Sequence, residues 1–290
     1  MPGPLNLKDA RAKRNWADRR LLTLGVETGE WANPDSDPIE TGEWEEHPDE
    51  RYTLIPFARA KPMSDEWPFA VGDIVSNYRA ALNYAAYALV LAGSIPEAAR
   101  DATDTRIQFP IVHPALSHPP TAESFAADGW VHGKLPGVCE KYLRAISPFQ
   151  PYEARGNEPL NALRVLSNAD KHRHPLLMAQ VARIEGAISE ARKNAEGTPV
   201  STFGITLLPG RLAPEPGTYI ARLDWAPGFH PVRARRGQLN PAVSNQPEVG
   251  VYLQITAGVA FKDDISGAVT EVLWGISLTL QRVFEALEAV

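Results

Sequence analysis

Cysteine is almost absent from this chain, since Cys139 is the only one in 290 residues. A single cysteine excludes an intrachain disulfide and any zinc site built from several cysteines. Runs of about 18 or more apolar residues, which a transmembrane helix needs, are also missing. The sequence contains no glycine-rich phosphate loop, no serine nucleophile elbow and no His-Glu-x-x-His pattern. We therefore predict no cofactor, no bound metal and no membrane partner.

A surplus of positive charge is missing too. The chain has 29 Lys and Arg against 35 Asp and Glu, which gives a formal net charge of -6. This balance argues against a broad nucleic-acid surface, which requires clustered cations, although a local basic patch is compatible with it. The first residues, Met1 to Leu5, lack the apolar core of a signal peptide. Together with the cysteine content, this predicts a cytoplasmic protein.

Hydrophobic periodicity predicts helices in the first part of the chain and strands in the second. The expected helices are 7–25, 65–92, 121–128, 137–146 and 160–172. The expected strands are 51–60, paired with a segment around 40–46, and then 176–184, 200–208, 218–225 and 249–261. A last amphipathic helix at 268–289 carries one apolar stripe formed by Val269, Val272, Ile276, Leu280, Val283 and Leu287.

This order predicts an α+β fold rather than alternating βαβ units. We expect an antiparallel sheet of four or five strands, with the C-terminal helix packed on it. The expected parts are an N-terminal helix and β-hairpin at 1–62, a helical core at 63–175, and the sheet with the last helix at 176–290, which forms one compact unit with the core.

Two helices carry polar faces that need an explanation. The basic first half of helix 7–25 is interpreted as a solvated face; it contains Lys8, Arg11, Lys13, Arg14, Arg19 and Arg20. Helix 65–92 has an apolar stripe of Tyr78, Leu82, Ala85 and Leu89. Its second, polar stripe contains Asp73, Ser76, Asn77, Ala80 and Tyr84. We expect this second stripe to be buried against the polar end of helix 160–172, because unpartnered polar groups are costly to bury.

The polar end of that helix, Ser167 to His174, is the densest cluster of chemically active side chains. Arg164, Asn168 and His172 are spaced i, i+4 and i+8, so they share one face. A histidine there could exchange protons near neutral pH. Cations at a helix C-terminus are equally expected from the helix dipole, without any function.

A metal site is not expected in this cluster. Asp170, His172 and His174 are spaced i, i+2 and i+4, and side chains two residues apart on a helix diverge. The three residues also fall short of a full set of ligands.

Four short segments resemble a family of uncharacterised, mainly bacterial proteins. They are Val71 to Leu89, with the pattern GD-x3-N-x-R-x-AL-N, then Phe109-Pro110-Ile111, Gln150-Pro151-Tyr152 and Leu166 to Arg173, with LSN-x-DKHR. These matches cover about 70–175 and occur in the expected order. The family has no established activity, so this resemblance implies no reaction.

The two helices more distantly resemble the HEPN superfamily, many of whose active members are dimeric, metal-independent ribonucleases. Asn168 and His172 match the polar and histidine positions of its signature. Arg164 lies farther from His172 than the signature arginine does, which departs from the family pattern. HEPN domains also occur as inactive binding modules.

Two functional hypotheses follow from the residues and this resemblance. In the first, the protein is a non-catalytic binding or interaction module with a buried polar network. In the second, it is an HEPN-like ribonuclease or toxin of bacterial defence or stress, acting on RNA as a homodimer. His172 would be the acid-base group of the ribonuclease. The other catalytic candidates are Asn168, Asp170, Arg173 and Arg164, and the supporting candidates are Asp73, Asn77, Arg79, Lys171 and His174. Whether the protein is an enzyme stays open.

Overall fold

The structure of the chain is a computed structural model. It describes residues 4–33, 39–93, 106–112, 121–151, 158–171, 177–188, 203–207, 216–225, 231–232, 249–261 and 265–290. The chain divides into two compact units. The first comprises Met1–Gly25, Asp65–Leu176 and Phe261–Val290, and the second comprises Val26–Ser64 and Leu177–Ala260.

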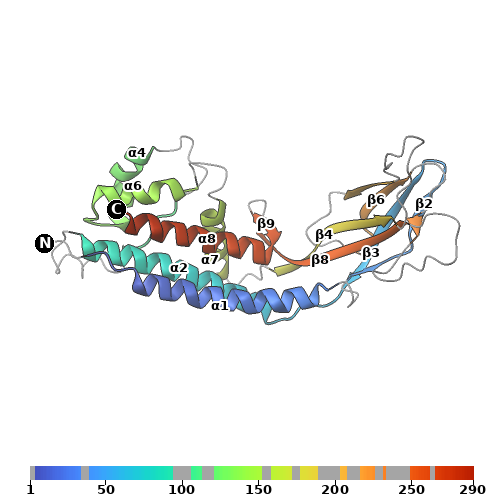
Figure 1. The fold of residues 1–290 in the computed structure, drawn as a ribbon, viewed down its shortest axis with the longest axis horizontal. Coiled ribbons are helices and arrows are strands. Elements are labelled where there is room, and N and C mark those ends of the chain that lie inside the picture. Colours follow the sequence, from blue (N-terminus) through green and yellow to red (C-terminus); the bar gives the residue numbers. More distant parts are fainter. Residues whose placement is uncertain are drawn as a thin grey trace. The chain divides into compact units, whose positions relative to one another are not determined.

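Helices build the first unit (Figure 1). The long helices are α1 (Lys8–Trp31), α2 (Trp67–Ala92), α7 (Glu158–Lys171) and α8 (Val269–Glu288). The short ones are α4 (Ala122–Ala127), α5 (Gly129–Lys134), α6 (Glu140–Ile146) and the 3₁₀ helix η3 (Ser147–Phe149). All the helices expected from the periodicity are confirmed, with the expected segment 121–128 and its continuation forming α4 and α5.

Helix α2 lies at the centre of this unit and contacts both α7 and α8. Its predicted apolar stripe is confirmed, because Tyr78, Leu82, Ala85 and Leu89 are all fully buried. Burying one large apolar side chain stabilises the fold by about 1.5–3 kcal/mol. At the end of α2, a Cβ atom on Gly93 would lie only 2.5 Å from the carbonyl oxygen of Gly137. The backbone of α2 therefore ends close against the turn that leads to α6.

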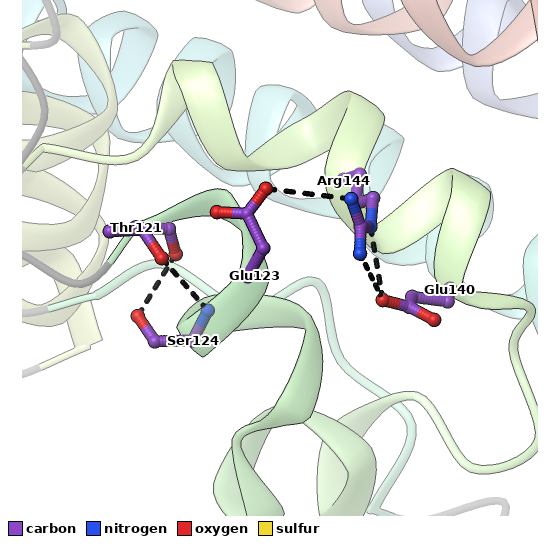
Figure 2. A network of polar contacts seen from close by, with 5 residues as sticks. All are labelled: Thr121, Glu123, Ser124, Glu140 and Arg144. Carbon is purple, nitrogen blue, oxygen red and sulfur yellow. Dashed lines mark hydrogen bonds and ion pairs between the residues drawn. The ribbon is translucent and has the colours of Figure 1, made fainter.

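Side-chain caps define the short helices. Thr121 Oγ1 accepts a hydrogen bond from the backbone amide of Ser124 at 3.2 Å and so caps α4. Asp128 interrupts the helical segment and caps α5, with Oδ1 accepting from the amides of Trp130 and Val131 at 2.7 and 3.3 Å. Arg144 of α6 lies 3.4 Å from Glu123 of α4, and Figure 2 shows this ion pair between the two helices. Cys139, the single cysteine of the chain, is exposed at the N-cap of α6.

A five-stranded antiparallel sheet belongs to the second unit. Its strands are β1 (Ile39–Thr41), β2 (Glu45–His47), β3 (Tyr52–Ala60), β5 (Phe203–Leu207) and β6 (Tyr219–Trp225). Their order is β1-β3-β6-β5, and β2 also pairs with β3. The predicted pairing of segment 40–46 with segment 51–60 is confirmed by the β1–β3 and β2–β3 ladders. On β3, Thr53, Ile55 and Phe57 alternate as buried residues, as expected for a strand with one covered face.

A second sheet contains β4 (Leu177–Ile188), β7 (Pro231–Val232), β8 (Val249–Phe261) and β9 (Ile265–Ala268). Strands β4 and β8 are antiparallel along their length, from Leu177 opposite Val259 to Ile188 opposite Val249. The short strand β7 runs parallel to β8. The expectation of a single sheet from 176 to 262 was therefore wrong. Alternation shows that a strand has a buried face, but it does not identify the neighbouring strand, and β6 pairs with β3 from the N-terminal part.

The α+β fold class is confirmed, but the apolar stripe of α8 has a different partner from the one expected. Val269, Ile276, Leu280, Val283 and Leu287 are buried. Helix α8 contacts α2, α6 and α7, and among the described strands it meets β9, which directly precedes it. The stripe thus packs in the core of the helical unit, against α2, α6 and α7. A helical period predicts that one face is buried, and helices and sheets can both cover such a face.

Candidate functional site

The predicted cluster at the end of α7 is only partly within the described residues. Helix α7 ends at Lys171, and Asp170 and Lys171 are its last two residues. His172, Arg173 and His174 lie outside the described residues. The side chains that can be placed are therefore those of the preceding turns, Arg164, Ser167 and Asn168.

Arg164 is engaged within its own helix. Its Nε and Nη2 atoms donate to Asn161 Oδ1 at 3.2 and 2.7 Å. Ser167 is buried and its hydroxyl donates to the carbonyl oxygen of Arg164 at 3.1 Å. Asn168, by contrast, is exposed to solvent in the last turn of α7. Sequence reasoning missed Asn161, although its spacing of three residues from Arg164 places the two on one helix face.

The expected packing of α2 beside α7 is confirmed, but the polar stripe of α2 does not have the expected environment. Asp73, Ser76 and Tyr84 are exposed rather than buried. Asn77 Nδ2 donates to Asp73, at 2.8 Å to the carbonyl oxygen and 3.0 Å to Oδ1. Lys13 of α1 in turn donates to Asn77 Oδ1 at 3.3 Å. The described bonds of Asp73 and Asn77 thus connect them to each other and to α1. The rest of the polar stripe can face solvent, because water satisfies polar side chains as well as protein groups do.

Arg79 and Asn83, on another face of α2, hold the backbone of a separate segment. Arg79 Nη2 donates to the carbonyl oxygen of Phe109 at 3.2 Å, and Asn83 Oδ1 accepts from the Phe109 amide at 3.2 Å. Three residues later, the amide of Val112 donates to Gln150 Oε1 at 3.0 Å. We call Arg79, Asn83 and Gln150 the clamp residues. They bring together three of the four segments that carry the family resemblance.

The electrostatics of the clamp residues are unusual. Burial lowers the pKa of the Arg79 guanidinium, because the charged form loses hydration. Nη1 of Arg79 and Nε2 of Gln150 are both buried and have no hydrogen-bond partner within the described part of the chain. Asn83 and Gln150 were not among the predicted site residues, although both lie in the segments that carry the resemblance.

A second polar cluster joins α1, α2 and α8. Asp18 Oδ1 accepts from the hydroxyls of Tyr78 and Ser277 at 2.7 and 2.6 Å. Arg14 lies 3.4 Å from Asp18 Oδ2 and donates to Ser277 Oγ and Gln281 Oε1 at 3.2 and 3.1 Å. Burial, and then the hydrogen bond and charge of Asp18, raise the pKa of Tyr78. This tyrosine therefore acts as a fixed donor rather than as a proton-exchanging group.

The basic strip on α1 is therefore not a uniformly solvated face: Lys13 and Arg14 form partly buried hydrogen bonds, whereas Arg11 pairs at the surface. Arg11 forms a bidentate pair with Glu288, at 3.1 Å from Nε to Oε1 and 2.6 Å from Nη2 to Oε2. Lys13 and Arg14 also reach neighbouring helices. Lys8, Arg19 and Arg20 are exposed, as expected. Helical spacing alone does not distinguish these two groups, because long cationic side chains can extend along a neighbouring helix.

Among the described side chains, no three His, Cys, Asp or Glu gather in a way that could hold a metal ion. Within the same residues, no helix combines the length and hydrophobicity of a membrane span. Comparisons of the chain with protein-family models, with curated proteins and with solved structures find no match.

Proposed function

We propose that this protein is a non-catalytic binding or interaction module whose helical unit is held together by buried polar contacts. The observation that supports this most strongly is the double hydrogen bond to Asp18, which Tyr78 and Ser277 both donate. This carboxylate accepts two hydroxyls and also lies 3.4 Å from Arg14, so its bonding capacity is used by side chains of the fold. Such a group is suited to joining three helices.

The other polar side chains of the helical unit support the same proposal. Arg164 bonds to Asn161 on its own helix, and Asp73 and Asn77 bond to each other and to Lys13. Arg79 and Asn83 bond to backbone atoms of Phe109. These contacts are structural, because each side chain satisfies a hydrogen-bonding group of a neighbouring part of the fold. A scaffold stabilised in this way is suited to presenting a binding surface.

A second proposal keeps the protein as an HEPN-like ribonuclease or toxin of bacterial defence, active on RNA as a cytoplasmic homodimer. Two observations favour it. Helix α2 packs beside α7, the helix pair on which the resemblance rests. Asn168, which matches the polar position of the HEPN signature, is exposed to solvent near the end of α7. In this proposal His172 is the acid-base group.

One experiment separates the two proposals. Purified wild-type protein and His172→Ala are incubated with mixed RNA in the presence of EDTA, and both are melted in parallel. The binding-module proposal expects no cleavage by either protein. RNA cleavage by the wild type that is lost in His172→Ala, with an unchanged melting temperature, would replace the binding module with the ribonuclease.

Asn168→Ala provides a second variant for the same assay. Its side chain is exposed, so the substitution should leave the melting temperature unchanged. Under the ribonuclease proposal it should reduce the cleavage rate. Cleavage that survives both substitutions would indicate a contaminating nuclease and would leave the binding module in place.

A further inference from the structure

The segment from Ile107 to Val112 is buried without belonging to a helix or a strand. Ile107, Phe109, Ile111 and Val112 each expose less than a tenth of their surface. A buried backbone requires partners for its amides and carbonyls. Here side chains supply them: Asn83 and Arg79 at Phe109, and Gln150 at Val112. Each clamp residue therefore uses one side-chain atom to bond the backbone of this segment, which is a structural role.

Arg79 and Gln150 each retain a buried donor beyond this task. Nη2 of Arg79 bonds to the Phe109 carbonyl, whereas Nη1 has no acceptor among the described residues. Gln150 is 0% exposed, and it uses Oε1 for the Val112 amide while Nε2 has no acceptor in that part of the chain. Buried donors are satisfied in nearly all folded proteins, so two unsatisfied donors against one short segment need an explanation.

The other buried or paired arginines of the helical unit show what Arg79 lacks. Arg14 faces the carboxylate of Asp18, and Arg11 faces that of Glu288. Even the exposed Arg144 has Glu140 and Glu123 beside it. No ion pair involving Arg79 occurs among the described residues, although burial already lowers its pKa. A guanidinium keeps its proton in proteins, and the Nη1 atom of this half-buried side chain is itself buried, so its positive charge calls for a negative one.

We infer that Arg79 and Gln150 bind a small oxyanion, a carboxylate or phosphate group, next to the Phe109–Val112 segment. The guanidinium would supply Nη1 and the charge, and the amide would supply Nε2. Carboxylate and phosphate oxygens accept hydrogen bonds only, and they match the donor geometry of arginine. This inference does not depend on the proposed function, because a binding module and a ribonuclease could both hold the anion.

The test compares the thermal stability of the full chain in phosphate, in acetate and in chloride at constant ionic strength. A ligand that binds only the folded state raises its melting temperature. The wild type should gain roughly 2–4 °C once the anion exceeds its Kd several-fold. A rise with phosphate alone, or with acetate alone, identifies the chemical class of the anion.

Two variants and one control make the test specific. Arg79→Gln removes the charge, and Gln150→Glu keeps the acceptor for the Val112 amide while it replaces the unpaired donor with a negative oxygen. Both should lose the anion-dependent rise. Arg144→Gln, which removes a solvent-exposed arginine of α6, should keep it. If Arg79→Gln fails to fold, Gln150→Glu carries the test alone.

Gln150→Glu also has an informative baseline. In chloride it should melt at or above the wild-type temperature, because under this inference its carboxylate would take the place of the anion that Arg79 and Gln150 share. A wild type that responds to neither phosphate nor acetate would overturn the inference. An equal response in all four proteins would overturn it as well, because the anion would then act on the protein surface in general.

Discussion

Tyr78 of α2 donates its hydroxyl to Asp18 Oδ1 of α1 at 2.7 Å, and this bond joins two helices 60 residues apart in sequence. The tyrosine ring is fully buried in the apolar stripe of α2, whereas its hydroxyl reaches the polar cluster. One side chain therefore contributes to both the apolar core and the network around Asp18. The hydroxyl can be removed without disturbing the ring, which makes the bond directly measurable.

Tyr78→Phe should lower the free energy of unfolding by about 1.5–3 kcal/mol, the range for hydrogen bonds to charged groups. Asp18 would keep Ser277 and Arg14 as partners. The measurement is urea denaturation followed by circular dichroism. Tyr84→Phe is the matched control, because Tyr84 lies on the same helix but is 44% exposed. Equal stability of the two variants would contradict the role of the Tyr78 hydroxyl.

The same hydroxyl predicts a dependence on alkaline pH. Burial and Asp18 raise the pKa of Tyr78 in the folded state above its unfolded value of about 10. Its contribution to stability is therefore complete below pH 10 and declines as the pH rises further, by about 1.4 kcal/mol per pH unit. The difference in unfolding free energy between wild type and Tyr78→Phe should shrink between about pH 10 and 11. A difference that stays constant over this interval would show that the hydroxyl titrates normally when folded.

Arg14→Gln should cost about 2–3 kcal/mol of stability, between the values for exposed and fully buried ion pairs. The side chains of Arg14 and Asp18 are 13% and 19% exposed, so the carboxylate would lose its cation in a partly dry environment. Arg19→Gln removes the same charge from an exposed position of the same helix and should change stability by less than about 0.5 kcal/mol. Chemical denaturation of both variants provides the comparison, and similar losses would indicate a general effect of net charge.

Gly93→Ala should destabilise the helical unit by about 1–3 kcal/mol, because the new methyl group would overlap the Gly137 carbonyl. Gly133→Ala is the opposite case, since a Cβ there meets no atom within 4 Å and the residue lies in α5. That substitution should leave stability unchanged or raise it slightly. Thermal melts of both variants show directly whether each substitution raises or lowers the melting temperature relative to the wild type. A neutral Gly93→Ala would mean that the end of α2 can move away from the Gly137 turn.

Much of the secondary structure could be predicted from local patterns, whereas the partners of each element could not. The stripe from Val269 to Leu287 identified α8 and its buried face, because helical period depends only on neighbouring residues. Whether that face meets helices or a sheet depends on the rest of the chain. The pairing of β3 with β6 is similar, since the ladder from Tyr52–Asp224 to Pro56–Tyr219 joins segments far apart in sequence.

The candidate site was predictable at the level of segments. Motifs around Arg79, Phe109 and Gln150 stand out in the sequence, but only the structure connects them through hydrogen bonds. Arg79 was expected to support the end of α7 and instead binds the Phe109 carbonyl. Arg14 was expected in solvent and instead faces Asp18. The residue type determines how far a long side chain can extend. The position of its charged group depends on the helix or loop that packs beside it, which local sequence does not reveal.

The pairing of α1 with α8 has a consequence for biosynthesis. Arg11 meets Glu288, Arg14 meets Gln281, and Asp18 meets Ser277, so the first long helix of the chain binds antiparallel to the last. Protein synthesis proceeds from the N-terminus, and domains fold as their residues emerge. The basic side chains of α1 therefore remain without these partners until α8 has left the ribosome. Because the described strands of both sheets precede α8 in sequence, they are synthesised before α1 can complete its contacts with α8.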